Sequence, residues 1–133
     1  MRFLSTITLL LVLFSFGLSK SYAQDGDDVL HEVWESMTAG DADRLAEQFD
    51  TRVEINLFGK SEEYTQAQAK YVMEQFFQDY PNSIFKILHK GNTDRTTYAV
   101  CEYTCDKGTF DVNVFIQQTA NGGVLSEIRF EAR

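Results

Sequence analysis

The sequence predicts an α+β domain in which three helices lie on one face of an antiparallel sheet. In the first half of the chain, apolar residues recur at helical spacing in three segments. In the second half the pattern changes to an alternation of apolar and polar residues, in segments separated by turn-forming residues. Helices grouped ahead of a meander of strands are typical of an α+β fold, with the helices on one sheet face.

Two helices are predicted at the start of this domain. The apolar face of the first consists of Val29, Leu30, Val33, Trp34 and Met37. Asp27 and Asp28 lie near its N-terminus, where the helix dipole favours acidic side chains. Gly40 is a typical stop, and Asp41 caps a short second helix. The inward residues of that second helix are Ala42, Leu45, Ala46 and Phe49.

A short strand and a third helix follow. Residues 53–57 alternate between apolar and polar side chains, and Gly59 ends this strand pattern. Thr65 and Gln68 form a capping-box sequence at the start of the third helix, and Pro81 marks its end. The buried stripe of this helix consists of Ala69, Val72, Met73, Phe76, Phe77 and Tyr80.

Four further strands are predicted over residues 84–90, 98–105, 109–118 and 124–131, with turns between them. The alternation places one set inward: Phe85, Ile87, His89, Ala99, Cys101, Tyr103, Cys105, Phe110, Val112, Val114, Ile116, Val124, Ile128 and Phe130. The outer face carries Ile84, Leu88, Tyr98, Val100, Phe115 and Leu125 among charged residues. That face is more apolar than contact with water requires.

The first 23 residues have the layout of a signal peptide. Arg2 gives a basic start, residues 3–18 are almost wholly apolar, and Ser21 and Ala23 place small residues before a cleavage site. A retained membrane anchor is the alternative, but the apolar run is shorter than the roughly 18–20 residues of a spanning helix. We therefore expect a signal peptide over residues 1–23 and a single domain over residues 24–133, exported to the periplasm or secreted, with no membrane anchor after cleavage.

The charge of the chain argues against nucleic acid as a partner. The full sequence has a net charge of −8. The leader contains two basic residues and no acid, which leaves ten basic against 20 acidic residues and a net charge of −10. A domain this acidic repels phosphate backbones and anionic membrane surfaces.

Cys101 and Cys105 are the two cysteines of the chain. On a regular strand they lie about 13 Å apart at ~3.3 Å per residue, whereas a disulfide needs Cα atoms within about 7 Å. We expect free thiols; a disulfide would require a bulge or an early strand end.

Four short motifs accompany the predicted order of elements. They are Phe85-x-Ile87-x-His89-x-Gly91, Tyr98-x-Val100, Phe76-Phe77 and Ile128-x-Phe130. In these motifs and in its element order, the chain resembles the nuclear-transport-factor-two-like (ketosteroid-isomerase-like) superfamily and, within it, a family of small exported bacterial proteins of unknown function. Cys101 departs from the pattern, which has glycine there. The resemblance implies a cone in which the three helices pack in the concave face of a curved sheet. It implies no single function, because the superfamily contains both enzymes and non-catalytic modules.

His89 is the first candidate for a functional site. On the predicted inward face its imidazole could serve as a general base or hold a polar group of a ligand; the alternative is a core histidine with satisfied hydrogen bonds. The isomerase chemistry of the superfamily needs a carboxylate in an apolar cavity, and Asp50, at the end of the second helix, and Glu54 are the nearest acids. Trp34, Tyr64 and Tyr103 are candidate ligand-binding residues with equally ordinary structural roles. No metal-binding motif is present, and no cofactor is expected.

Three functions remain open from the sequence. We expect a non-catalytic binding module for a small apolar or amphipathic ligand, or for a protein partner in the cell envelope. One alternative is a cofactor-free isomerase or dehydratase with His89 or Asp50 as its base. The other is a structural homodimer with a filled cone, associating through an outer sheet surface made of Leu88, Val100, Phe115 and Leu125. The interior of the cone distinguishes these three functions. An open pocket with a buried acid would favour the enzyme, an open neutral pocket the binding module, and a filled core the structural homodimer.

Overall fold

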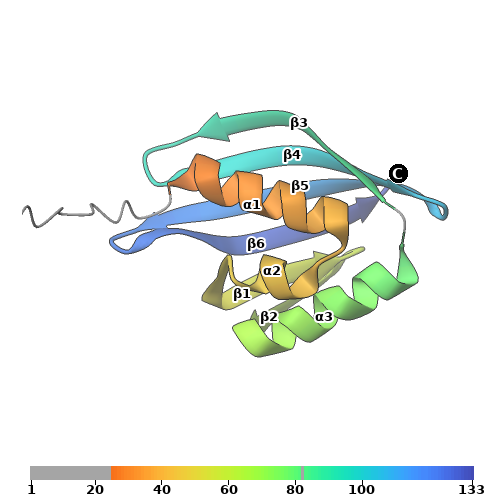
Figure 1. The fold of residues 1–133 in the computed structure, drawn as a ribbon. Helices are drawn as coiled ribbons and strands as arrows, with labels where there is room; N and C mark the ends of the chain where they lie inside the picture. The colour runs from red at the N-terminus through yellow and green to blue at the C-terminus, as the bar shows by residue number, and fades with distance from the viewer. Residues whose placement is uncertain (1–24, 82) are drawn as a thin grey trace, which may run out of the picture.

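A computed structural model describes residues 25–81 and 83–133; the predicted signal peptide lies outside the described residues. The helices are α1 (Gly26–Ala39), α2 (Ala42–Ala46) and α3 (Gln66–Asp79). The strands are β1 (Phe49–Leu57), β2 (Lys60–Thr65), β3 (Ile84–Asn92), β4 (Thr96–Cys105), β5 (Gly108–Thr119) and β6 (Gly122–Ala132). Figure 1 shows the helices in front of one extended sheet.

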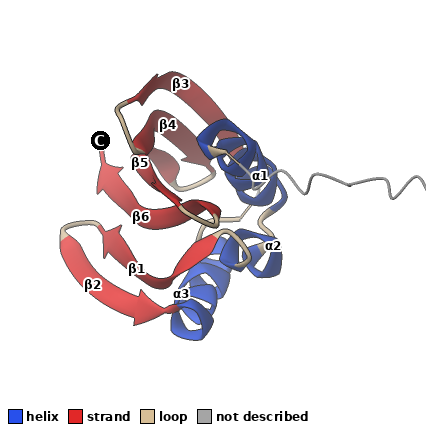
Figure 2. Ribbon diagram, turned by 90° about the vertical axis from the view of Figure 1, so that its left-hand side faces the viewer, coloured by secondary structure: helices blue, strands red, loops and turns tan. Residues whose placement is uncertain are grey.

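The strands form one six-stranded sheet in the order β2-β1-β6-β5-β4-β3. β1 runs parallel to β6, and every other neighbouring pair is antiparallel. Figure 2 shows that the sheet is curved and that the helices lie on its inner side. The predicted fold class, three helices in the concave face of a curved antiparallel sheet, is therefore confirmed, with β1 and β6 as the one parallel pair among the described strands.

Most of the predicted helix ends are also confirmed. The Asp25 carboxylate accepts a hydrogen bond from the backbone N–H of Asp28 at 2.9 Å, and Gly40 ends α1 in the left-handed conformation at φ 65°. Thr65 and Gln68 form the complete capping box of α3. One boundary was wrong: Phe49 begins β1 rather than ending α2, so Asp50 lies on a strand and not at a helix end.

β2 was not predicted from the sequence. A two-residue turn joins it to β1, in which Phe58 and Gly59 both have positive φ, 53° and 91°. Positive φ at both central residues is typical of the tightest hairpins, but phenylalanine is an unusual residue at the first of these positions. In addition, no side chain of β2 is fully buried. The strand therefore lacks the apolar alternation by which the others were recognised.

A β-bulge in β3 reverses the predicted orientation of His89. The register shifts between Ile87, which pairs with Cys101, and His89, which pairs with Val100. Leu88 is the extra residue, so Leu88 and His89 are both exposed on the outer face. The prediction that His89 faces inward with Phe85 and Ile87 was therefore wrong.

A second bulge, in β6, has the opposite effect on Leu125. The register shifts between the pair Phe115–Glu127 and the pair Ile116–Leu125. Leu125 consequently lies in the core and is fully buried, whereas Val124 is only half-buried. Leu125 does not belong to the outer apolar surface predicted from the sequence.

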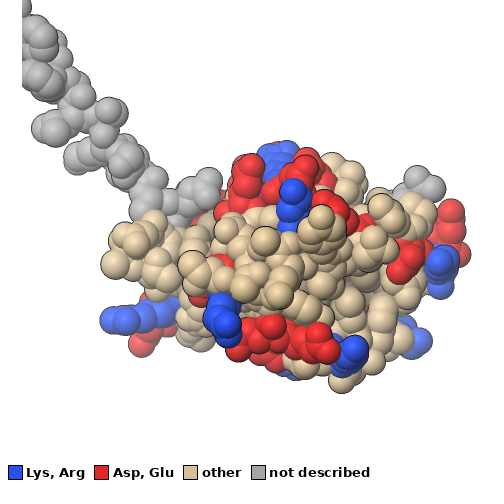
Figure 3. All heavy atoms as spheres, turned by 90° about the horizontal axis from the view of Figure 1, so that it is seen from below, with Lys and Arg blue, Asp and Glu red and all other residues tan. Residues whose placement is uncertain are grey.

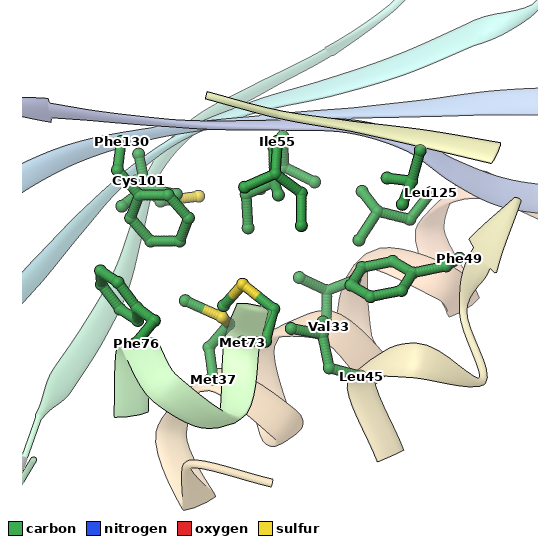
Figure 4. Packing of buried hydrophobic residues seen from close by; sticks show 14 of the residues in the cluster. Val33, Met37, Leu45, Phe49, Ile55, Met73, Phe76, Cys101, Leu125 and Phe130 are labelled. Carbon is green, nitrogen blue, oxygen red and sulfur yellow. The ribbon is translucent and has the colours of Figure 1, made fainter. Parts of the chain in front are cut away.

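The space between the helices and the sheet is filled by one continuous core. Figure 4 shows Met37, Met73 and Phe76 extending from the helices toward Ile55 and Phe130 on the sheet. The largest side chains with almost no exposed area are Tyr103, Phe130, Met37, Leu45, Ile55, Met73, Ile116, Leu125 and Ile128. The interior of this cone is thus a packed core.

Candidate functional site

The cone interior, the first place to look for a ligand, contains almost no polar chemistry. Within residues 25–81 and 83–133, Ser36 and Thr97 are the buried polar side chains. The Ser36 hydroxyl donates to the carbonyl of Glu32 at 2.7 Å, and the Thr97 hydroxyl donates to Asn92 Oδ1 at 2.7 Å. Both are therefore satisfied by the fold itself. No carboxylate or imidazole is buried in this part of the chain.

Tyr103 is the one predicted site residue that lies in the interior, and its hydroxyl serves the fold. It donates to the backbone carbonyl of Tyr80, just after α3, and its ring packs 5.2 Å from the ring of Phe76. Burial raises the pKa of the Tyr103 phenol above its ordinary value. This hydroxyl therefore ties α3 to β4 and is already engaged.

The two candidate bases lie far apart in the sheet. His89 is on β3, at one edge, and Asp50 is on β1, so β4, β5 and β6 separate them. The Asp50 carboxylate accepts a hydrogen bond from the backbone N–H of Thr51 at 2.7 Å. Glu54 is exposed and accepts a hydrogen bond from the Ser61 hydroxyl of β2. These groups do not converge on a common point.

Trp34 lies on α1 and contacts β3 at one edge of the sheet, whereas Tyr64 lies on β2 at the other edge. The Trp34 indole is 37% exposed, and its Nε1–H donates to the carbonyl of Phe85 on β3 at 3.1 Å. The Tyr64 hydroxyl on β2 donates to the Glu62 carboxylate at 2.8 Å. That hydrogen bond raises the pKa of Tyr64 and lowers the pKa of Glu62.

Outside the core, one hollow is an open groove of about 540 Å³ between α3 and the connection from α1 to α2. Its lining includes Gly40, Asp41, Asp43, Glu74, Phe77 and Gln78. Figure 3 shows the molecule from below, where Asp and Glu gather along the borders of the face and leave an uncharged surface between them. No group of three or more His, Cys, Asp or Glu in the described residues is arranged to hold a metal ion.

The feature that does bring predicted residues together is an apolar surface on the outer face of β3, β4 and β5. We call Leu88, His89, Tyr98, Val100 and Phe115 the outer patch. Cross-strand pairing joins His89 to Val100 and Tyr98 to Phe115. Leu88 is 54% exposed and Val100 is 36% exposed. Contiguous exposed apolar surface of this kind is typical of interaction sites.

Tyr98 organises the centre of the outer patch. Its ring centroid lies 6.0 Å from that of His89, and the ring covers Gly91, the residue with which it pairs on β3. A Cβ at Gly91 would lie 2.4 Å from the Tyr98 ring. This contact explains why glycine follows two residues after His89 in the motif quoted above.

The chain matches the family described as a domain of unknown function, DUF4783, over residues 30–131. It belongs to this family. A family of unknown function was predicted from the short motifs, and that prediction is thereby confirmed. The resemblance to nuclear-transport-factor-two-like proteins holds at the level of the fold. Curated proteins provide no match to the sequence.

Solved structures confirm the fold. A DUF4783 family protein from Bacteroides ovatus is 22% identical, with a TM-score of 0.74 over 77% of this chain and 93% of that chain. A designed protein with a curved β-sheet is 12% identical, with a TM-score of 0.68 over 81% of this chain and 100% of that chain. An NTF2-like protein of unknown function from Cytophaga hutchinsonii is 7% identical, with a TM-score of 0.60 over 78% and 86% of the two chains.

Proposed function

We propose that this protein is a non-catalytic module of the cell envelope that self-associates through the outer patch. The observation that carries the proposal is the contrast between the two sides of the sheet. The inner side is closed by a packed core with satisfied polar groups, whereas the outer side carries exposed Leu88 and Val100 beside half-buried Tyr98 and Phe115. A protein surface therefore fits the outer patch better than a small ligand fits the filled cone.

The charges around the outer patch suit a second copy of the same chain. Lys86 and Glu102 face each other across β3 and β4, and Arg129 and Glu127 lie on β6. In a two-fold symmetric interface the same patch of both copies is in contact. A rim that contains both signs of charge therefore offers opposite charges to the second copy. The chain after the predicted leader is acidic overall, so salt should strengthen the association by screening repulsion.

The proposed location rests on the leader sequence. No helix within the described ranges is both long and apolar enough to cross a membrane. Export is tested by the intact mass of the protein from its native envelope, which should begin at Gln24. A mature species that retains Met1, or one recovered from the cytoplasm, would contradict the proposed location.

Sedimentation velocity at high micromolar concentration tests the self-association. The unmodified chain should sediment as a dimer, and Phe115→Glu should sediment as a monomer with unchanged far-UV circular dichroism. Gln75→Glu is the matched control, because it adds the same charge at an exposed position of α3, away from the sheet; it should remain dimeric. A monomeric unmodified chain would refute the proposal, as would dissociation by both variants.

A further inference from the structure

β3 differs from the other strands in charge. It is an edge strand, with β4 on one side and no described strand on the other. It carries Lys86, His89 and Lys90 and no acidic residue, whereas each of the other five strands contains at least one Asp or Glu. The opposite edge, β2, carries Glu62 and Glu63. In an acidic chain, one sheet edge is therefore locally basic.

The backbone of β3 is open on its outer side. The Phe85 carbonyl accepts its hydrogen bond from the Trp34 indole and so points away from β4. Because these directions alternate along a strand, the backbone groups of Ile87 point the same way. In Figure 1, β3 forms the border of the sheet, and no described element lies beyond it. Unpaired backbone groups along an edge are a template for an added strand.

The outward side chains of this edge form a short recognition pattern. Lys86 lies between Ile84, which is 61% exposed, and Leu88, which is 54% exposed. The nearest cross-strand acid, Glu102, is paired with Arg133 at 2.9 Å. No ion pair within 4 Å joins Lys86 to an acid in the described part of the chain. The pattern offers an apolar, a basic and a second apolar contact at alternate positions.

Charge decides which kind of strand would fit. Two copies of β3 paired antiparallel would bring Lys86 and Lys90 of one copy close to the same basic residues of the other, and like charges across a strand pair are destabilising. An acidic segment paired with β3 would instead be attracted to these lysines. Lys90 is already paired with Asp27 of α1 at 3.2 Å, which leaves Lys86 as the main contact for such a segment.

We propose that the open edge of β3 binds an extended acidic segment of another protein, which adds a strand beside residues 84–88. The segment carries an acidic residue opposite Lys86 and apolar residues two positions to either side of it. The bulge at Leu88 limits the pairing to this short stretch. A backbone N–H of the segment replaces the Trp34 indole at the Phe85 carbonyl. This site shares Leu88 with the outer patch but does not involve Tyr98, Val100 or Phe115, and it goes beyond the proposed self-association.

The displacement of Trp34 provides the assay, because it is the one tryptophan of the chain. The probe is the end-capped peptide Thr-Val-Thr-Asp-Thr-Val-Thr, titrated while Trp34 fluorescence and backbone amide shifts are recorded. We expect a saturable fluorescence change, with amide shifts confined to residues 84–88 and the Trp34 indole. The same peptide with Lys in place of Asp should bind at least tenfold more weakly.

A charge reversal makes the test specific. Lys86→Glu should weaken binding of the acidic peptide at least tenfold and strengthen binding of the lysine peptide. Lys60→Glu, the same change on the other edge strand, should leave both affinities unchanged. Phe115→Glu should also bind the acidic peptide normally, which separates this site from the self-association. Absence of saturable binding, equal binding by Lys86→Glu, or pairing of β3 with a second copy without peptide would overturn the inference.

Discussion

Truncation of Phe76 tests whether the cone is filled. Phe76 is 3% exposed on α3, and its ring centroid lies 4.3 Å from that of Phe130 and 5.2 Å from that of Tyr103. Replacing a packed phenylalanine by alanine costs about 3–5 kcal/mol through lost transfer energy and the cavity left behind. The higher helix propensity of alanine offsets only about 0.5 kcal/mol of this. Phe76→Ala should therefore remove a large part of the stability of a domain of this size.

The assay is urea unfolding followed by far- and near-UV circular dichroism, with Tyr71→Ala as the matched control. Tyr71 lies on the same helix but is 70% exposed, so its truncation should cost less than about 0.5 kcal/mol. A loss of under about 1 kcal/mol for Phe76→Ala would show that its ring borders open space. The reasoning that excludes an interior ligand pocket would then be refuted.

Three further predictions follow from side-chain environments. His89→Ala should change the free energy of unfolding by less than about 0.5 kcal/mol, because the imidazole is exposed; a loss above 2 kcal/mol in urea unfolding would place it in the core. Burial raises the pKa of the Cys101 thiol to about 12, so iodoacetamide at pH 8 should label half-buried Cys105 first, with both thiols labelled on denaturation. Failure of both to react after denaturation without reductant would reveal a disulfide. The hydrogen bond from Arg44 lowers the pKa of Glu35 below its ordinary value of 4.5; because the folded pKa is lower than the unfolded one, the stability it contributes is present above pH 4.5 and lost as pH falls through the folded pKa. Arg44→Met should reduce this loss of stability at acid pH. An unchanged pH profile of the free energy of unfolding would contradict the prediction.

Local signals were sufficient for the helices and for most strands. Asp25, Gly40 and Thr65 act as caps within one turn of the helices they bound, so short-range chemistry determines those ends. The apolar alternation of β4 and β5 identified their inward faces, because these strands pair without a bulge between them. The family resemblance and the order of all elements except β2 followed from these local features.

The sequence was less informative wherever a strand departs from regular alternation. In β3 the extra residue is Leu88, which follows apolar Ile87, and in β6 it is Ser126, which follows apolar Leu125. Consecutive apolar residues also occur over 98–101 in β4 and 114–116 in β5, which pair with each other without a bulge, so they do not mark the bulges in the sequence. The orientation of His89 depends on the single extra residue in β3, since a shift by one position exchanges the two faces of a strand.

The distances between the candidate site residues could not be predicted, because they depend on the strand order. Nothing in the sequence places β3 at an edge or inserts β1 parallel to β6. The separation of His89 from Asp50 by three strands follows from that order alone. The apolar character of the outer face was visible from Val100 and Phe115, and the structure adds His89 to it and removes Leu125.

Contacts between two copies test the central proposal most directly. A sample that mixes labelled and unlabelled chains, studied by isotope-filtered NMR, reports only contacts between molecules. We expect intermolecular contacts from the Val100 and Leu88 methyl groups to the aromatic rings of Tyr98 and Phe115 of the second copy. Intermolecular contacts at α3, or none at high micromolar concentration, would contradict self-association through the outer patch.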